Sequence, residues 1–135
     1  MAVIESLFSE LVRDQLRHLM DKILQIDKDI VRFVGIFNIK ENCLMTKMQQ
    51  GKVSYMTQRE EDTFALYLKS MKKMQEGLDH ALGKVILMEI RREKLYQLVF
   101  FVGNFIIFVT VEPIINRRIL ENILNYIEIA IQSIC

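Results

Sequence analysis

Hydrophobic residues recur at helical spacing through residues 4–26, a stretch that contains neither Gly nor Pro. At about 100° per residue the apolar positions form two stripes that point roughly 100° apart. One stripe contains Ile4, Leu7, Phe8 and Leu11, and the other contains Val12, Leu16, Leu19, Ile23 and Ile26. Because a straight helix cannot turn both stripes to one surface, we expect either a break near Val12 or an N-terminal half that packs on a second protomer.

Two strands are predicted after this helix. Residues 30–38 are β-branched and aromatic on both alternating faces apart from Arg32, a pattern typical of a central strand. A polar turn at residues 39–42 separates this segment from a shorter and weaker strand at residues 43–48.

Three more strands are predicted in the second half of the chain. Residues 84–93 have one apolar and one half-polar face, and this indicates a strand at the edge of a sheet. Apolar runs at residues 95–102 and 105–111 are mirrored about Gly103-Asn104, which predicts a β-hairpin buried on both faces.

Two further helices complete the prediction. Thr57 and Glu60 have the spacing of a capping box, and Gly83 is expected to end the helix that begins there. Its inward stripe is predicted to contain Phe64, Leu68, Met71, Met74 or Gln75, Leu78 and Leu82. The last helix, residues 116–134, follows Pro113 and is expected to turn inward Ile119, Leu120, Ile123, Leu124, Ile127 and Ile131.

The order α-β-β-α-β-β-β-α predicts an α+β fold. Strands with apolar residues on both faces need helices on both sides of the sheet. We therefore expect one domain, residues 1–135, with a five-stranded antiparallel sheet between helices, as in profilin-like and longin-like proteins.

Composition narrows the functional classes. The chain is 51% hydrophobic and 26% charged, which is typical of a folded domain. Its 18 basic and 17 acidic residues leave a net charge of +1, so we expect neither nucleic acid nor an anionic membrane as a partner. Residues 95–115 are apolar enough to resemble a membrane span, but the Gly-Asn pair and Pro113 favour the hairpin. We expect a cytoplasmic protein.

No group of residues predicts catalysis. His18 and His80 have no ligand or nucleophile at useful spacing, and Cys43 and Cys135 form neither a disulfide framework nor a metal motif. The acidic run from Glu60 is explained by the positive end of a helix dipole. Glycine-rich phosphate loops are absent from the sequence. We therefore expect a protein that is not an enzyme and that uses no cofactor or metal.

Several short phrases occur together in a recognisable order. They are Lys22-Ile23-Leu24-Gln25-Ile26-Asp27, Ile30-Val31-Arg32-Phe33-Val34-Gly35-Ile36, Met48 with Gly51, Glu60-Glu61-Asp62, Leu82-Gly83, Arg92-Glu93-Lys94 and Glu112-Pro113. Because these phrases occur in this order, residues 19–127 resemble the small roadblock-like proteins of ammonia-oxidising archaea, which are part of the roadblock/longin superfamily. The turn at residues 39–42 departs from that pattern because it contains no Gly.

The resemblance implies a non-catalytic domain that dimerises through its second helix and third strand. Such domains serve as platforms for small GTPases, motors or signalling proteins. We expect a homodimer, and the candidate interface residues are Ile4, Phe8, Leu11, Met71, Met74, Val85, Leu87, Glu89 and Arg91. The alternative is a small-molecule sensor with an apolar pocket between the sheet and the first helix, beside Cys43 and the methionines.

Overall fold

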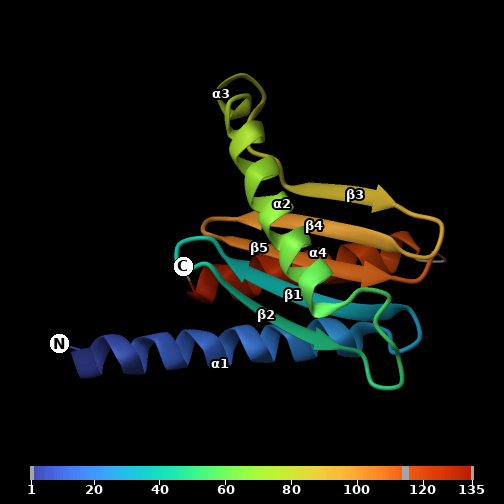
Figure 1. Cartoon of the computed structure of the whole chain (residues 1–135), viewed down its shortest axis with the longest axis horizontal. Helices are drawn as coiled ribbons and strands as arrows, with labels where there is room; N and C mark the ends of the chain where they lie inside the picture. The colour runs from blue at the N-terminus through green and yellow to red at the C-terminus, as the bar shows by residue number, and fades with distance from the viewer. Residues whose placement is uncertain (1, 114–115, 135) are drawn as a thin grey trace.

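The computed structural model describes residues 2–113 and 116–134, with side chains for residues 10–113, 116–130 and 132. An antiparallel sheet in the order β2-β1-β5-β4-β3 forms its middle layer (Figure 1). The strands are β1 (Val31–Asn38), β2 (Cys43–Met48), β3 (Leu87–Arg91), β4 (Tyr96–Val102) and β5 (Phe105–Val111). The helices are α1 (Ala2–Ile26), α2 (Gln58–Glu76), α3 (Asp79–Leu82) and α4 (Arg117–Ile134). The predicted α+β fold is confirmed.

Helices cover both faces of the sheet, which therefore has a separate apolar core on each side. Helices α1 and α4 pack on one face, and α2 crosses the other (Figure 1). The first core includes Leu16, Leu19, Ile23, Val34, Phe100, Ile107, Ile123 and Ile127. The second core includes Phe33, Phe37, Ala65, Leu68, Val99, Ile106 and Phe108.

The predicted hairpin of β4 and β5 is confirmed. Val102 pairs with Phe105, and Gly103 has a φ of +56°, a backbone conformation that Gly adopts at little cost. All seven residues of β5 are buried because this strand occupies the middle of the sheet. The continuous apolar run of the sequence thus corresponds to a strand covered on both faces.

Helix α1 does not break near Val12, so the first of the two predicted alternatives is ruled out, and packing of its N-terminal half on a second protomer stays a prediction. It is continuous over Ala2–Ile26, and its N-terminal part extends beyond the sheet (Figure 1). Leu11 is 62% exposed, whereas Leu16 is buried in the first core. The change in stripe direction therefore marks the point at which the helix leaves the sheet. Ile4 and Phe8 belong to this extension, but their side chains lie outside the described residues.

Helix α2 begins as predicted but ends earlier. The capping box is present: Thr57 accepts from the Glu60 amide, and the Glu60 carboxylate accepts from the Thr57 amide. The helix ends at Glu76 instead of continuing to Gly83, which ends the separate helix α3. The predicted inward residues Leu78 and Leu82 are 54% and 79% exposed. The end of α2 passes beyond the edge of the sheet, so no sheet lies beneath these residues (Figure 1).

The predicted third strand is an edge strand, as expected, but it is shorter than residues 84–93. β3 contains only Leu87–Arg91, and it pairs with β4 alone. β2 forms the other edge of the sheet.

A buried arginine attaches the loop between β2 and α2 to the end of the sheet. Arg32 is 6% exposed, and one of its guanidinium nitrogens donates to Glu112 while the other donates to the Val53 carbonyl at 2.8 Å. Its guanidinium also lies 4.3 Å from the centre of the Tyr55 ring. Lys52 donates to the same Glu112 carboxylate at 3.1 Å. A buried charge needs such partners, and this one obtains them by fixing the loop.

Gly35 is required because it faces a packed aromatic ring. A Cβ placed there would lie 2.2 Å from a ring carbon of Phe108, which is fully buried and contacts the rings of Phe33 and Phe64. We expect Gly35→Ala to lower the free energy of unfolding by about 1–3 kcal/mol through overpacking, measured by urea denaturation. Gly77→Ala is the control, because its added Cβ meets nothing closer than 3.5 Å. Equal stability of the two variants would contradict this account of the packing.

Glu112 should make stability depend on acid pH. Burial raises the pKa of Glu112, but hydrogen bonds and charges from Arg32 and Lys52 outweigh that effect and hold the pKa below 4.5. Because the pKa is lower in the folded chain than in the unfolded chain, the stabilisation is present above about pH 4.5 and is lost as the pH falls below that value.

We therefore expect Glu112→Gln to lower the free energy of unfolding at neutral pH by about 1–3 kcal/mol. The free energy of unfolding of this variant should also decrease less than that of the wild type as the pH falls below about 4.5. Urea denaturation across a pH series measures both effects. Glu121→Gln is the control, since Glu121 makes only an exposed pair with Arg117 at 3.6 Å. Identical acid dependence in wild type and Glu112→Gln would show that other carboxylates dominate.

Candidate functional site

The side of α2 that faces away from the sheet contains exposed apolar residues. Leu66, Tyr67 and Met74 are 53%, 56% and 78% exposed, whereas Ala65 and Leu68 are buried beneath the helix. At about 100° per residue the three exposed residues fall within one arc of the helix, opposite Leu68. Sequence reasoning missed Leu66 and Tyr67, although this second apolar stripe could have been found from the same spacing.

The exposed apolar residues continue from α2 around the β3 edge of the sheet. Leu78, Leu82 and Ile86 are 54%, 79% and 66% exposed. We call the α2–β3 surface the set Leu66, Tyr67, Met74, Leu78, Leu82 and Ile86. It lies beside a strand whose outer backbone groups have no neighbouring strand. Exposed apolar side chains next to an open edge are typical of a surface that binds another chain.

The predicted interface residues fall into several environments. Met74 belongs to the α2–β3 surface, and Val85 is half-buried just before β3. Met71 packs against the second core and Leu87 against the first. Glu89 and Arg91 are exposed on β3 and form an ion pair at 3.2 Å, with the Arg91 guanidinium 5.3 Å from the Tyr96 ring centre.

The structure does not bring the N-terminal helix residues to this surface. Leu11 lies on α1, which runs along β2, whereas α2 ends beyond the opposite edge of the sheet (Figure 1). The candidate residues therefore lie in two separate regions of the molecule.

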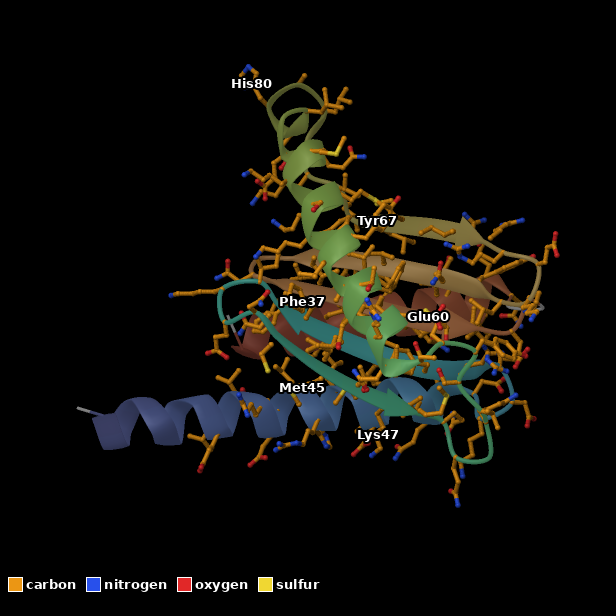
Figure 2. The ribbon with its side chains drawn as sticks, viewed as in Figure 1. Phe37, Met45, Lys47, Glu60, Tyr67 and His80 are labelled. Atoms are coloured by element: carbon orange, nitrogen blue, oxygen red, sulfur yellow. The ribbon has the colours of Figure 1, made fainter. Side chains whose placement is uncertain are left out.

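The carboxylates at the start of α2 have separate local roles. Backbone and side-chain hydrogen bonds from Thr57 lower the pKa of Glu60 (labelled in Figure 2). Burial raises the pKa of Glu61, an effect that its hydrogen bond with the Ser54 hydroxyl opposes. Asp62 accepts from the Gln58 amide at 3.1 Å. These contacts explain each carboxylate without general acid–base chemistry.

The two histidines are exposed on different helices, and His80 lies at the far tip of the molecule (Figure 2). Among the residues whose side chains are described, no three His, Cys, Asp or Glu side chains are grouped as metal ligands. Within the same part of the chain, no helix combines the length and apolar character needed to span a membrane.

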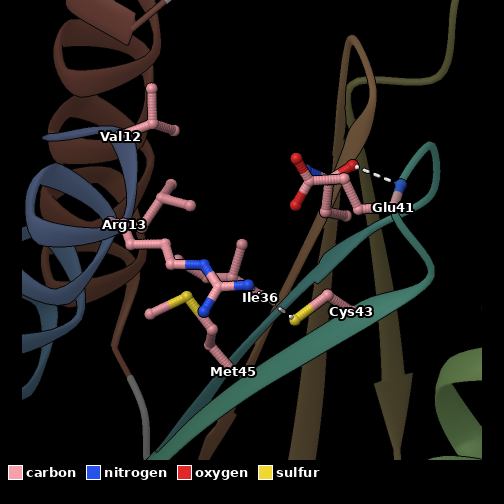
Figure 3. A pocket seen from close by; sticks show the side chains of 8 residues that line it. Val12, Arg13, Ile36, Glu41, Cys43 and Met45 are labelled. Carbon is pink, nitrogen blue, oxygen red and sulfur yellow. Dashed lines mark hydrogen bonds between the residues drawn. The ribbon is translucent and has the colours of Figure 1, made fainter. Parts of the chain in front are cut away.

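A pocket of about 120 Å³ lies between α1 and the β1–β2 hairpin (Figure 3). Its apolar wall consists of Val12, Leu16, Ile36 and Met45. Its polar residues are Arg13, Asn38, Glu41 and Cys43. A pocket thus lies where the alternative function, a small-molecule sensor, would need one, and the sensor function itself stays a prediction.

Comparison with solved structures identifies the fold. The gliding protein MglB of Thermus thermophilus superposes with a TM-score of 0.67 at 12% identity, over 90% of this chain and 86% of that one. A roadblock/LC7 domain of Streptomyces avermitilis superposes with a TM-score of 0.57 at 11% identity, over 86% and 91%. An MglB with a tetrameric arrangement superposes with a TM-score of 0.62 at 15% identity, over 90% and 85%.

At these identities the likeness concerns the fold alone. No protein-family model matches the chain, and no curated protein matches its sequence. The fold expected from the resemblance, that of roadblock/longin proteins, is confirmed.

Proposed function

We propose that this protein is a non-catalytic interaction domain that forms a homodimer through α2 and β3. The dimer then serves as a platform for a further protein, a small GTPase or another signalling partner. The observation that carries this proposal is the α2–β3 surface, which places six exposed apolar side chains beside an open strand edge. An MglB of the same fold has a tetrameric arrangement, which supports self-association as a property of such domains.

The two edges of the sheet differ in a way that favours β3 for pairing. β2 lies along α1, and its Lys47 (labelled in Figure 2) forms an ion pair with Asp21 of that helix. A lysine at a strand edge discourages association with another strand. β3 has no helix along its outer side in Figure 1, and the exposed Ile86 precedes it.

A second copy is the occupant that fits β3 best. Two-fold symmetry would pair the β3 edges antiparallel, satisfy their outer backbone groups and close the assembly. A register centred on Ile90 would place Glu89 opposite Arg91 of the other copy, and the two-fold would repeat this contact. Opposite charges facing each other across neighbouring strands stabilise that register.

Self-association should depend on Tyr67. We expect the wild-type protein to have a solution mass of twice 16.0 kDa by size exclusion with light scattering, with little dependence on salt. Tyr67→Glu should raise the dissociation constant at least about tenfold, because aromatic residues at interface centres contribute strongly to binding. Tyr126→Glu is the matched control, as Tyr126 is a 43% exposed tyrosine on α4.

Both variants should retain the wild-type circular dichroism, because both tyrosines are exposed in the single chain. A wild-type protein that stays monomeric at high micromolar concentration would overturn the homodimer. Equal weakening by the two substitutions would place the interface elsewhere.

The register of the paired strands can be tested by exchanging charges. Glu89→Arg and Arg91→Glu should each raise the dissociation constant roughly two- to tenfold, because each puts like charges opposite one another. The double variant should recover most of the lost affinity, since it restores opposite charges with reversed polarity. Additive weakening in the double variant would contradict the register centred on Ile90.

A further inference from the structure

The pocket between α1 and the β1–β2 hairpin has the features of a small-molecule site. Three of its residues come from α1 at the place where this helix leaves the sheet, and the others come from the two strands and their turn (Figure 3). It is remote from the α2–β3 surface, which lies beyond the opposite edge of the sheet. An inference about this pocket therefore does not depend on self-association.

The small volume of the pocket limits the size of the apolar group that it can hold. The whole pocket has a volume of about 120 Å³, and the apolar part of its wall consists of Val12, Leu16, Ile36 and Met45. An aliphatic cavity of about 150 Å³ holds a molecule of benzene. By that comparison the pocket accepts a branched aliphatic group of about four carbons.

Two opposite charges face this space without pairing. Figure 3 shows Arg13 extending from α1 across the pocket toward Cys43, and the Glu41 carboxylate pointing into the same space from the turn. Among the described residues, neither side chain forms an ion pair. One helical turn away, by contrast, Arg17 pairs with Asp14 at 2.8 Å.

The contacts that Arg13 and Glu41 do make leave their charges available. Among the described residues, the one hydrogen bond of the Arg13 guanidinium is to the Cys43 sulfur, at 3.9 Å, which is a weak interaction. The backbone amide of Glu41 donates to the Asn38 side chain at 3.2 Å, and this contact fixes the turn without using the carboxylate.

We propose that the pocket binds a free aliphatic α-amino acid of the size of leucine. The ligand carboxylate would accept hydrogen bonds from Arg13, its ammonium group would donate to Glu41, and its side chain would occupy the apolar wall. A simple carboxylate would match Arg13 but would be repelled by Glu41, and a simple amine would have the reverse mismatch. A zwitterion satisfies both charges, and the apolar wall selects the side chain.

Such a ligand would join α1 to the turn between β1 and β2. It would thereby hold α1 against the sheet at the point where its N-terminal extension begins. The pocket thus couples amino-acid binding to the position of a helix that has no sheet beneath its N-terminal part.

The ligand chemistry is tested by isothermal calorimetry with leucine and three analogues that each lack one group. The analogues are 4-methylpentanoate, which has no ammonium group, 3-methylbutylamine, which has no carboxylate, and glycine, which has no side chain. We expect leucine to bind about tenfold more tightly than each analogue, the difference typical of one lost charged or apolar contact. Absence of leucine binding at millimolar concentration, or equal binding by any analogue, overturns the proposal.

Two variants that each remove one charge test which group of the ligand Arg13 binds and which group Glu41 binds. Arg13→Gln should weaken leucine and 4-methylpentanoate about tenfold and should tighten 3-methylbutylamine, because it removes the cation that repels this ligand. Glu41→Gln should weaken leucine and 3-methylbutylamine about tenfold and should tighten 4-methylpentanoate, because it removes the carboxylate that repels this ligand. Arg17→Gln, on the same exposed helix surface, is the control and should bind all ligands as the wild type does. Identical ligand profiles in Arg13→Gln and Arg17→Gln would overturn the assignment.

Cys43 reports whether binding occurs in this pocket. In a Cys135→Ser background, its thiol can be alkylated with iodoacetamide, and alkylation should slow as leucine saturates the site. Leucine binding that leaves the rate of Cys43 alkylation unchanged would place the site elsewhere and overturn the proposal.

Discussion

Burial of the central strand β5 on both faces is the constraint from which the architecture follows. Its seven residues are apolar apart from Thr110, and all are buried. At about 25 cal/mol for each Å² of apolar surface, a single uncovered face would be very costly. Helices α1 and α4 cover one face, and α2 covers the other. The two cores and the strand order are consequences of this requirement.

Two of the covering helices are longer than the sheet they cover. α1 has 25 residues and is therefore about 38 Å long, whereas strands of seven or eight residues extend only about 25 Å. α2 has 19 residues, about 29 Å, and crosses a sheet of five strands that is about 20 Å wide. The excess length of α1 extends beyond the ends of the strands, and that of α2 extends beyond the β3 edge (Figure 1). The pocket lies beside the first overhang and the α2–β3 surface beside the second.

Local patterns in the sequence predict the elements well but do not indicate where the sheet ends. The capping box at Thr57 and the hairpin at Gly103 depend on neighbouring residues, so both could be predicted. The apolar spacing of α2 continues to Leu78 and Leu82, yet these two residues are exposed because the sheet edge lies before them. That edge is set by the short strand β3, whose length depends on its pairing with β4.

Individual residues of the family resemblance have structural roles that the sequence alone could not assign. Gly35 makes room for the Phe108 ring, and Arg32 and Glu112 hold the loop between β2 and α2. None of these residues lies on the α2–β3 surface or in the pocket. Gly35, Arg32 and Glu112 therefore maintain the scaffold, whereas the proposed self-association and ligand binding depend on Tyr67 of α2, Arg13 of α1 and Glu41 of the β1–β2 turn.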